Sequence, residues 1–248
     1  MTHTTSLFPS VFAPLRATRG RRVLLLLGVV VGAAVALLAA AEPPDNTSAP
    51  DFVELSRLVQ SAVSVPLPFL GVLLAGDVRT AASTVGRSAA IRLLAARAVS
   101  AAVAGAAVGA VGVVVTAFAV GDWVPQVVPG CLVVQALGVL VGLSFGLLVR
   151  PTWLAMVLDA TVPVGLWAAA GLLELTGAQR WLFPYDAVED LIATGAAPLD
   201  WVQEGVVVLV WVVAPFVTWG LRSLRAVEAD RARTVGSAVR RGGSEITG

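Results

Sequence analysis

Residues 21–42 read "RRVLLLLGVVVGAAVALLAAAE": two arginines, an unbroken apolar run and a glutamate. A helix rises about 1.5 Å per residue, so about 20 residues cross a hydrocarbon core roughly 30 Å thick. The run therefore predicts a membrane-spanning helix at Val23–Ala41. A cleaved signal peptide is the alternative, because the small residues Ala39 and Ala41 precede Glu42. We favour the spanning helix, since the apolar core of a signal peptide is only about 7–15 residues long.

The whole chain has the composition of a membrane protein. It has 248 residues, of which 57% are hydrophobic and 13% charged, whereas soluble domains carry roughly 25% charged residues. Five more apolar runs predict spans at Leu58–Gly76, Ala98–Val120, Cys131–Val149, Trp153–Leu175 and Gly205–Leu221. Pro66 and Pro68 predict a kink or a break in the second span. We expect an all-α polytopic membrane protein with six transmembrane helices.

The charges predict how the bundle is oriented. One side carries 15 of the 17 arginines: four in 1–22, four in 77–97, one at Arg150 and six in 222–248. Eleven of the 16 acidic residues lie on the other side. Cytoplasmic loops are enriched in arginine, so we expect both termini in the cytoplasm. The domains are then a basic interface segment at 1–22, a six-helix domain at 23–221 and an Arg-rich tail at 222–248.

The segment before the last span, about Thr176–Glu204, differs from a simple hydrated loop. It contains "RWLFPYDAVEDLIATG" at 180–195, with apolar residues at helical spacing, acids on the other side and a possible helix stop. Its aromatic residues suit the lipid headgroup region. We expect one or two short interfacial or re-entrant helices here. The residues concerned are Trp181, Tyr185, Val188, Leu191, Ile192, Gly195 and Trp201.

The residues needed for catalysis or metal binding are scarce. The chain has one histidine, His3, one cysteine, Cys131, and no lysine, and it contains neither an HExxH nor a CxxC motif. A serine nucleophile would lack a basic partner in the membrane. We therefore expect no enzymatic activity, no metal site and no cofactor in this chain. A formal net charge of +1 gives no reason to expect nucleic-acid binding.

Asp159 is the ionisable residue that falls inside a predicted span. Ionisable residues within a membrane are usually functional, so it either lines an aqueous path or pairs with Arg150 or Arg97. Other polar residues at depth either contact a translocated substrate or form interhelical hydrogen bonds. The candidates for a translocation path are Gln135, Ser144, Asp159 and Thr161; Thr116 and Thr218 are the remaining polar residues at depth.

Glycines repeat every four residues in two spans. Gly138, Gly142 and Gly146 share one face of the fourth span, and Gly105 and Gly109 share a face of the third. Glycines allow two helix backbones to approach closely in lipid. Both a dimer interface and packing within one subunit are consistent with this pattern.

The stretch 76–97, "GDVRTAASTVGRSAAIRLLAAR", places four arginines among small residues between two apolar runs. Arg79 and Arg87 bracket the small residues, and Arg92 and Arg97 lie at the entry to the third span. Such a surface is either a cytoplasmic docking site for another protein or a loop that sets the topology and touches anionic lipid headgroups.

The order of several motifs resembles the permease subunits of ATP-binding-cassette exporters of the type-two class. In sequence order these are "LRATRGRR", "GDVRTAAS", "SAAIRLLAARAVSAAVAG", "LGVLVGLSFGLLVRPTWLAMVL" and "WLFPYDAVEDL". The resemblance implies a six-span subunit that forms a homodimer or heterodimer. It also implies a coupling helix at about Asp77–Arg92, which docks on a separate ATPase through Asp77, Arg79, Arg87 and Arg92, and an interface helix at 10–22. The chain departs from common members in lacking lysine and in its long basic tail, Arg222–Arg241.

The absence of lysine indicates which subunit binds ATP. A phosphate-binding GxxxxGK[ST] loop requires lysine, so we expect ATP to be bound by the partner subunit. The hypothesis is a non-enzymatic permease subunit of an ATP-driven exporter in the plasma membrane of a bacterium, since the Ala/Val/Gly/Arg bias is typical of high-GC bacterial genomes. The alternatives are a membrane scaffold or regulatory subunit without a transport path, and a secondary transporter.

Overall fold

The computed structural model describes residues 15, 18–41, 51–84, 87–183, 191–192 and 196–222, and the regular structure in these ranges is helical. Six helical segments are long and apolar enough to cross a membrane, as the sequence predicts. The helices are α2 (Arg19–Ala41), α3 (Phe52–Ser64), α4 (Leu67–Thr84), α5 (Arg87–Val120), the 3-10 helix η1 (Pro125–Val127), α6 (Val128–Leu148), α7 (Thr152–Leu172), α8 (Thr176–Leu182), α10 (Pro198–Val208) and the π-helix η2 (Leu209–Val213), after which the last span continues as α-helix to Arg222.

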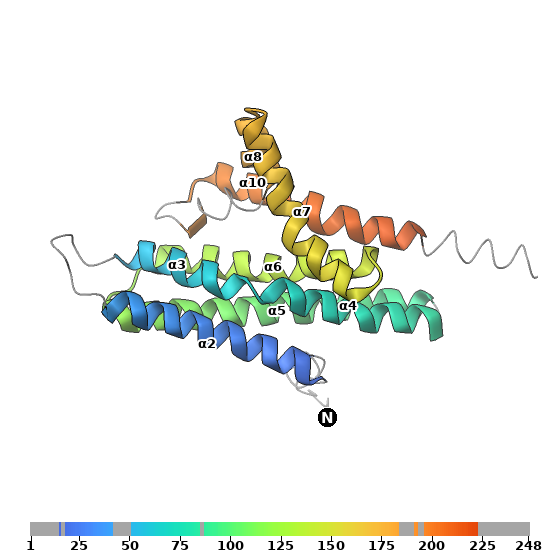
Figure 1. Ribbon diagram of the computed structural model, residues 1–248, viewed down its shortest axis with the longest axis horizontal. Helices are drawn as coiled ribbons and strands as arrows, with labels where there is room; N and C mark the ends of the chain where they lie inside the picture. The colour runs from blue at the N-terminus through green and yellow to red at the C-terminus, as the bar shows by residue number, and fades with distance from the viewer. Residues whose placement is uncertain are drawn as a thin grey trace, which may run out of the picture.

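Helices α2 to α6 lie side by side, and α6 packs most extensively on α4 and α5 (Figure 1). The largest apolar cluster forms between these helices and includes the fully buried Leu70, Leu74 and Leu143. Helix α7 leaves the bundle at a steep angle, with α8 beyond its far end (Figure 1). Only a narrow face of α7 packs inward: Ala155, Asp159 and Pro163 are buried at intervals of four residues.

The second span is broken, as its prolines predict. Helix α3 ends at Ser64, Val65 and Pro66 form a turn, and α4 begins at Leu67. Proline lacks a backbone N–H and clashes with the preceding helical turn. The break therefore divides this crossing into two helices.

Helix α3 also begins earlier than expected. Asp51 caps it by accepting a hydrogen bond from the Glu54 backbone N–H at 2.7 Å. The second span was predicted to begin at Leu58, whereas this N-cap starts the helix at Phe52 and places Arg57 in its second turn.

The predicted coupling helix at Asp77–Arg92 is not a separate element. Residues Asp77–Thr84 are the last two turns of α4, and Arg87–Arg92 are the first turns of α5. The alanines and arginines in this stretch are good helix formers, so both spans extend beyond their apolar runs. The stretch is the tip of a helical hairpin, which we call the α4–α5 tip and define as residues 80–84 and 87–92.

Four of the five repeated glycines pack inside this one chain. A Cβ at Gly105 would meet the Gln135 carbonyl oxygen, and a Cβ at Gly109 would lie 2.8 Å from the Cys131 carbonyl oxygen. The same close approach holds α6 to α4, where Gly142 faces Pro68 and Gly146 faces Val72. The structure thus shows packing within the subunit at these positions, and they are not available as a dimer face.

Gly138 is the exception among the five. An added Cβ there would meet no heavy atom of the described residues within 4 Å. It faces an open space between helices instead of a neighbouring backbone.

The third, fourth and last spans start earlier than predicted, at Ala89, Pro125 and Pro198, and the remaining boundaries shift by only a few residues. In the segment before it, α8 is helical and Leu191 and Ile192 are helical and buried. The predicted roles of Tyr185, Val188 and Gly195 lie outside the described residues. So do those of 1–14, 16–17 and 223–248, which hold most of the interface segment and the basic tail.

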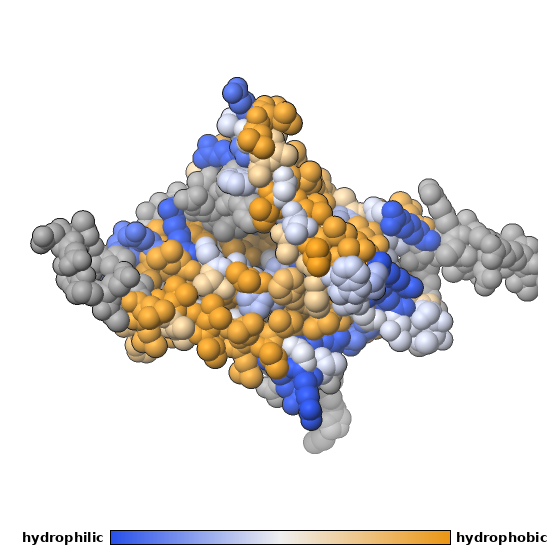
Figure 2. All heavy atoms as spheres, in the orientation of Figure 1, coloured by the Kyte–Doolittle hydropathy of each residue, from blue (hydrophilic) through white to orange (hydrophobic). Residues whose placement is uncertain are grey.

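Apolar side chains dominate the visible face of the bundle, and hydrophilic ones gather toward its ends (Figure 2). The start of α2, the tip of the α4–α5 hairpin and the end of the last helix point toward the same end (Figure 1). Asp51 and Asp122 belong to the opposite end, where Phe52 and Trp123 make an edge-to-face contact at 6.2 Å. The described part of the chain therefore has the charge segregation of a multi-pass membrane protein.

Candidate functional site

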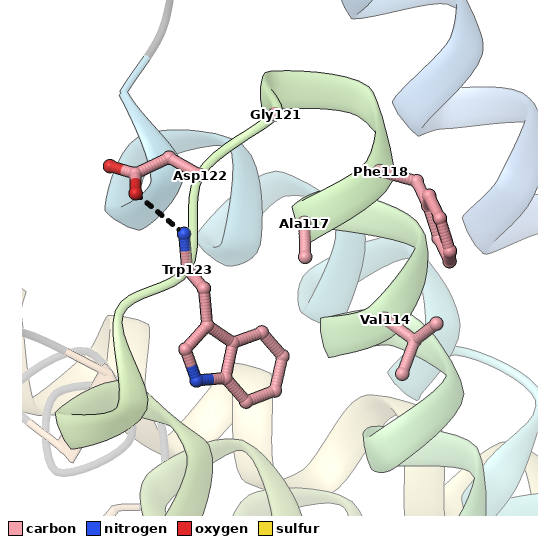
Figure 3. Close-up of a pocket in the computed structure, with 6 residues that line it drawn as sticks. All are labelled: Val114, Ala117, Phe118, Gly121, Asp122 and Trp123. Atoms are coloured by element: carbon pink, nitrogen blue, oxygen red, sulfur yellow. Dashed lines mark hydrogen bonds between the residues drawn. The ribbon is translucent and has the colours of Figure 1, made fainter.

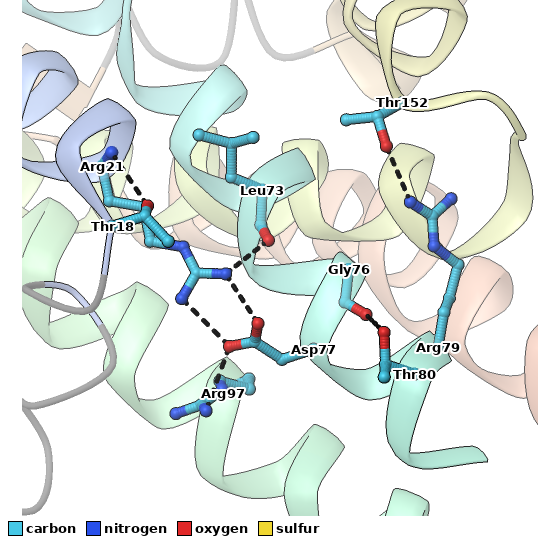
Figure 4. A network of polar contacts seen from close by, with 9 residues as sticks. All are labelled: Thr18, Arg21, Leu73, Gly76, Asp77, Arg79, Thr80, Arg97 and Thr152. Carbon is cyan, nitrogen blue, oxygen red and sulfur yellow. Dashed lines mark hydrogen bonds and ion pairs between the residues drawn. The ribbon is translucent and has the colours of Figure 1, made fainter. Parts of the chain in front are cut away.

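A charged cluster ties three helices together at the arginine-rich end (Figure 4). Arg21 of α2 donates to both carboxylate oxygens of Asp77 in α4, with Nη1–Oδ2 at 3.0 Å and Nη2–Oδ1 at 2.8 Å. Its Nη2 also donates to the Leu73 carbonyl oxygen at 2.7 Å. Arg97 of α5 approaches the same carboxylate, with Nη2–Oδ2 at 3.0 Å. We call Arg21, Asp77 and Arg97 the Asp77 cluster.

Burial makes this cluster strong. The Arg21 side chain is 4% exposed, Arg97 is 17% exposed and Asp77 is 30% exposed. A bidentate arginine–carboxylate pair has both geometric specificity and a large electrostatic attraction when water is excluded. One carboxylate thus neutralises two guanidinium groups only in part, and its removal would leave both facing each other.

Arg79 links the same end of α4 to the junction between α6 and α7. Its Nη1 donates to the Val149 carbonyl oxygen at 2.7 Å, and its Nη2 donates to Thr152 Oγ1 at 3.0 Å. Figure 4 shows it directed to the side of α4 opposite to Asp77. The end of α4 is thereby connected by polar contacts to α2, α5 and the α6–α7 junction.

The predicted coupling residues separate into two groups. Asp77 and Arg79 make contacts within the chain. Arg92 is exposed on the first turns of α5; Arg87 lies in the same helix, and its side chain is outside the described residues. Sequence reasoning missed the pairing of Arg21 with Asp77, because a one-dimensional pattern gives no contact between residues 56 positions apart.

A second candidate is a cavity of about 640 Å³ between the broken second span, α6 and α7. Asp159 lines it from α7, Gly138 from α6, and Gln60 and Arg57 from α3. Most of the remaining lining is apolar, and Val65 and Pro68 at the helix break form part of it. The break and the missing Gly138 side chain together leave this space open.

Asp159 does not pair with either predicted arginine. Arg97 bonds Asp77, and among the described residues neither carboxylate oxygen of Asp159 has a hydrogen-bond partner. The side chain is 6% exposed. The first alternative, that Asp159 lines a path, agrees with its position in the cavity.

The other predicted path residues do not line this cavity. Ser144 and Thr161 each donate to the carbonyl oxygen four residues earlier in their own helix, at 3.0 Å and 2.8 Å. Thr116 and Thr218 do the same. The expectation of interhelical hydrogen bonds is wrong for these four hydroxyls, because a preceding carbonyl is always within their reach.

Gln135 does form the expected interhelical contact, with a residue that sequence reasoning overlooked. Its Nε2 donates to the Gln60 side-chain and backbone oxygens, both at 2.8 Å, and Gln60 Nε2 donates to the Gly109 carbonyl oxygen at 3.0 Å. The two amides join α3, α5 and α6 in the middle of the bundle. Gln60 could have been found from the sequence, because it is a polar residue inside the second predicted span.

We expect replacement of Gln135 by leucine to lower the melting temperature, because Gln60 loses its donor while remaining buried. The loss should be about 1–2 kcal/mol, the size of such bonds between membrane helices. The double variant Q60L/Q135L should lose less than the sum of the two single variants, since no orphaned amide remains. Thermal unfolding can be followed through Cys131, the buried and only cysteine, which a thiol-reactive dye labels as the bundle opens. Strictly additive losses would contradict the coupling.

A shallow groove at the opposite end of α5 offers little chemistry (Figure 3). Helix α5 ends where Gly121 adopts a left-handed conformation with φ of 75°. The charged group in the groove, Asp122, accepts a hydrogen bond from the Trp123 backbone N–H at 2.7 Å. The rest is apolar, with Phe118 directed outward, so the groove resembles a lipid-facing surface.

The described residues contain no group of three His, Cys, Asp or Glu side chains that could hold a metal ion. Comparison with protein-family models, with curated proteins and with solved structures finds no match to this chain.

Proposed function

We propose that this chain is the membrane-spanning subunit of an ATP-driven exporter in the plasma membrane of a bacterium, and that a separate ATPase supplies the energy. Six apolar helical segments support a membrane-embedded role. The chain has no lysine, which a phosphate-binding loop requires. The resemblance to type-two permeases likewise implies that the membrane subunit and the ATPase are separate chains. It also predicts a dimer of such membrane subunits.

The observation that carries the proposal is the Asp77 cluster at the base of the α4–α5 tip. Force applied to the tip reaches α2 through Arg21, α5 through Arg97 and the start of α7 through Arg79. Packed helices transmit such displacement because close-packed contacts do not deform continuously. A partner that moves the tip would therefore move the helices around the Asp159 cavity.

The ATPase docks, in this proposal, on the exposed part of the tip. Ser83, Thr84 and Arg92 are exposed there. Their short or cationic side chains leave an accessible surface for an acidic cleft on the partner. With the arginine-rich end in the cytoplasm, as the positive-inside rule predicts, the tip meets the compartment that contains ATP.

Purification of the tagged chain from membranes of its source cell should yield an ATPase subunit in stoichiometric amount. We expect Arg92→Glu to reduce this association at least about tenfold, because charge reversal at an interface costs about 1.4 kcal/mol or more. Arg222→Glu is the matched control, since Arg222 is also exposed, in the last described turn of its helix. A wild-type chain that purifies without an ATPase, or equal association of the two variants, would contradict the proposal.

A further inference from the structure

We propose that the Asp159 cavity binds an organic monocation with a bulky apolar body, which makes amphipathic cations the substrate class of this subunit. The inference rests on the proposed function for the view that the cavity belongs to a transport path. Its physical basis is the match between one buried carboxylate and a largely apolar wall.

Asp159 is a buried carboxyl group beside the cavity. Both oxygens of Asp159 are shielded from solvent and have no hydrogen-bond partner among the described residues. A buried polar group without a partner is costly, and buried charges in membrane helices normally pair. A cation in the cavity would lie beside the Asp159 side chain, which lines it, and the low local dielectric would strengthen the attraction.

Asp159 differs from the other polar groups that line the cavity in being available to pair with a cation. The Gln60 amide is engaged with Gly109 and Gln135, and Ser64 Oγ donates to the Ser61 carbonyl oxygen at 2.7 Å. Arg57 also lines the cavity and has an interaction of its own within the chain. Asp159 is thus the charged group of the lining for which the structure shows no partner.

The wall of the cavity selects the body of the ligand. It includes Val65, Phe69, Val134, Leu137 and Val141. A volume of about 640 Å³ falls within the roughly 300–1,000 Å³ of sites that enclose drug-sized molecules. The Phe69 ring adds a face that attracts cations. A small inorganic cation would leave most of this wall without contacts.

Gly138 gives the ligand room. An added Cβ would meet nothing within 4 Å in the described structure, although Gly138 lies on the face of α6 that packs tightly at Gly142. The space at Gly138 is therefore a local opening in an otherwise close-packed helix interface. A larger side chain at this position would fill the cavity without touching the packing below it.

Equilibrium binding of radiolabelled tetraphenylphosphonium to the full chain in lipid nanodiscs tests the inference. We expect saturable binding that Asp159→Asn weakens at least about tenfold, the effect of losing a charged partner, and that Asp159→Glu retains. Tetraphenylborate has the same shape and the opposite charge, so we expect it not to compete. Equal affinity in the wild type and Asp159→Asn, or equal competition by the borate, would overturn the proposal.

A second pair of variants keeps the test independent of the charge. Gly138→Leu should abolish binding by filling the cavity, whereas Gly165→Leu, on the exposed side of α7, should leave it unchanged. Unaltered binding in Gly138→Leu would place the probe elsewhere and overturn the proposal. The assay contains neither ATP nor a partner, so an absent ATPase would refute the proposed function and leave the cavity as a cation site.

Discussion

Asp77→Ala should be the most destabilising single substitution in the charged part of the chain. It leaves the guanidinium groups of Arg21 and Arg97 facing each other in a partly buried site without the carboxylate that lies between them. Breaking a buried ion pair by removing one partner costs about 3–5 kcal/mol, and we expect about 3 kcal/mol because Asp77 is 30% exposed. For a chain of this size that corresponds to a fall of roughly 6–12 °C in melting temperature. The dye-labelling of Cys131 during heating measures it.

Two further variants distinguish electrostatics from lost packing. Asp122→Ala removes a carboxylate at the opposite end that bonds only the adjacent backbone N–H, so it should change the melting temperature by less than 2 °C, the scale of about 0.5 kcal/mol for an exposed polar group. The double variant D77A/R97A removes one of the two facing cations and should regain part of the loss. If it is less stable than D77A alone, repulsion between the arginines is not the cause.

Asp77→Ala also tests the proposed coupling between the ATPase and the membrane helices. With Asp77 absent, α4 loses its ion pairs to α2 and α5, while the α4–α5 tip keeps its exposed docking surface. We therefore expect the ATPase still to associate with Asp77→Ala, with transport uncoupled from hydrolysis. Loss of association would instead mean that the cluster shapes the docking surface itself.

The sequence was sufficient for the features that depend on local composition. Apolar runs near the length of a bilayer crossing predicted six spans, and Pro66 predicted the break between α3 and α4. The glycine spacing predicted close helix approach, and the structure adds the partner helices, as for Gly109 against Cys131. Each of these follows from residues near one another in the chain.

The features that the sequence does not reveal depend on contacts between distant residues. Nothing in the sequence relates Asp77 to Arg21, although the structure pairs them. The sequence leaves open whether Asp159 lines a path or pairs with Arg150 or Arg97, because only the folded chain shows that Arg97 is already engaged. The tip of the α4–α5 hairpin was interpreted as a separate coupling helix, because helix propensity does not reveal whether a helical stretch continues its neighbours. The sequence thus indicates residues of the Asp77 cluster and of the Asp159 cavity, but it does not indicate which of them are in contact.

Gly142→Ala should have the second largest effect, and it tests the packing that places the cavity. A Cβ at Gly142 would overlap the Pro68 carbonyl oxygen, which is backbone and cannot rotate away. Helices α4 and α6, which share one of the two most extensive contacts of the bundle, would have to separate. We expect a loss of about 3 kcal/mol, the upper end of the usual cost of overpacking, seen as a lower temperature for Cys131 labelling.

Gly138→Ala is the matched control, one helical turn earlier on the same face of α6. The added methyl group enters open space, and alanine is favoured over glycine in a helix by up to about 1 kcal/mol. We therefore expect Gly138→Ala to be neutral or slightly stabilising, so that the same chemical change has opposite effects at positions four residues apart. Equal destabilisation by both variants would mean that α6 rejects any side chain on this face, and the space beside Asp159 would then not exist in the folded protein.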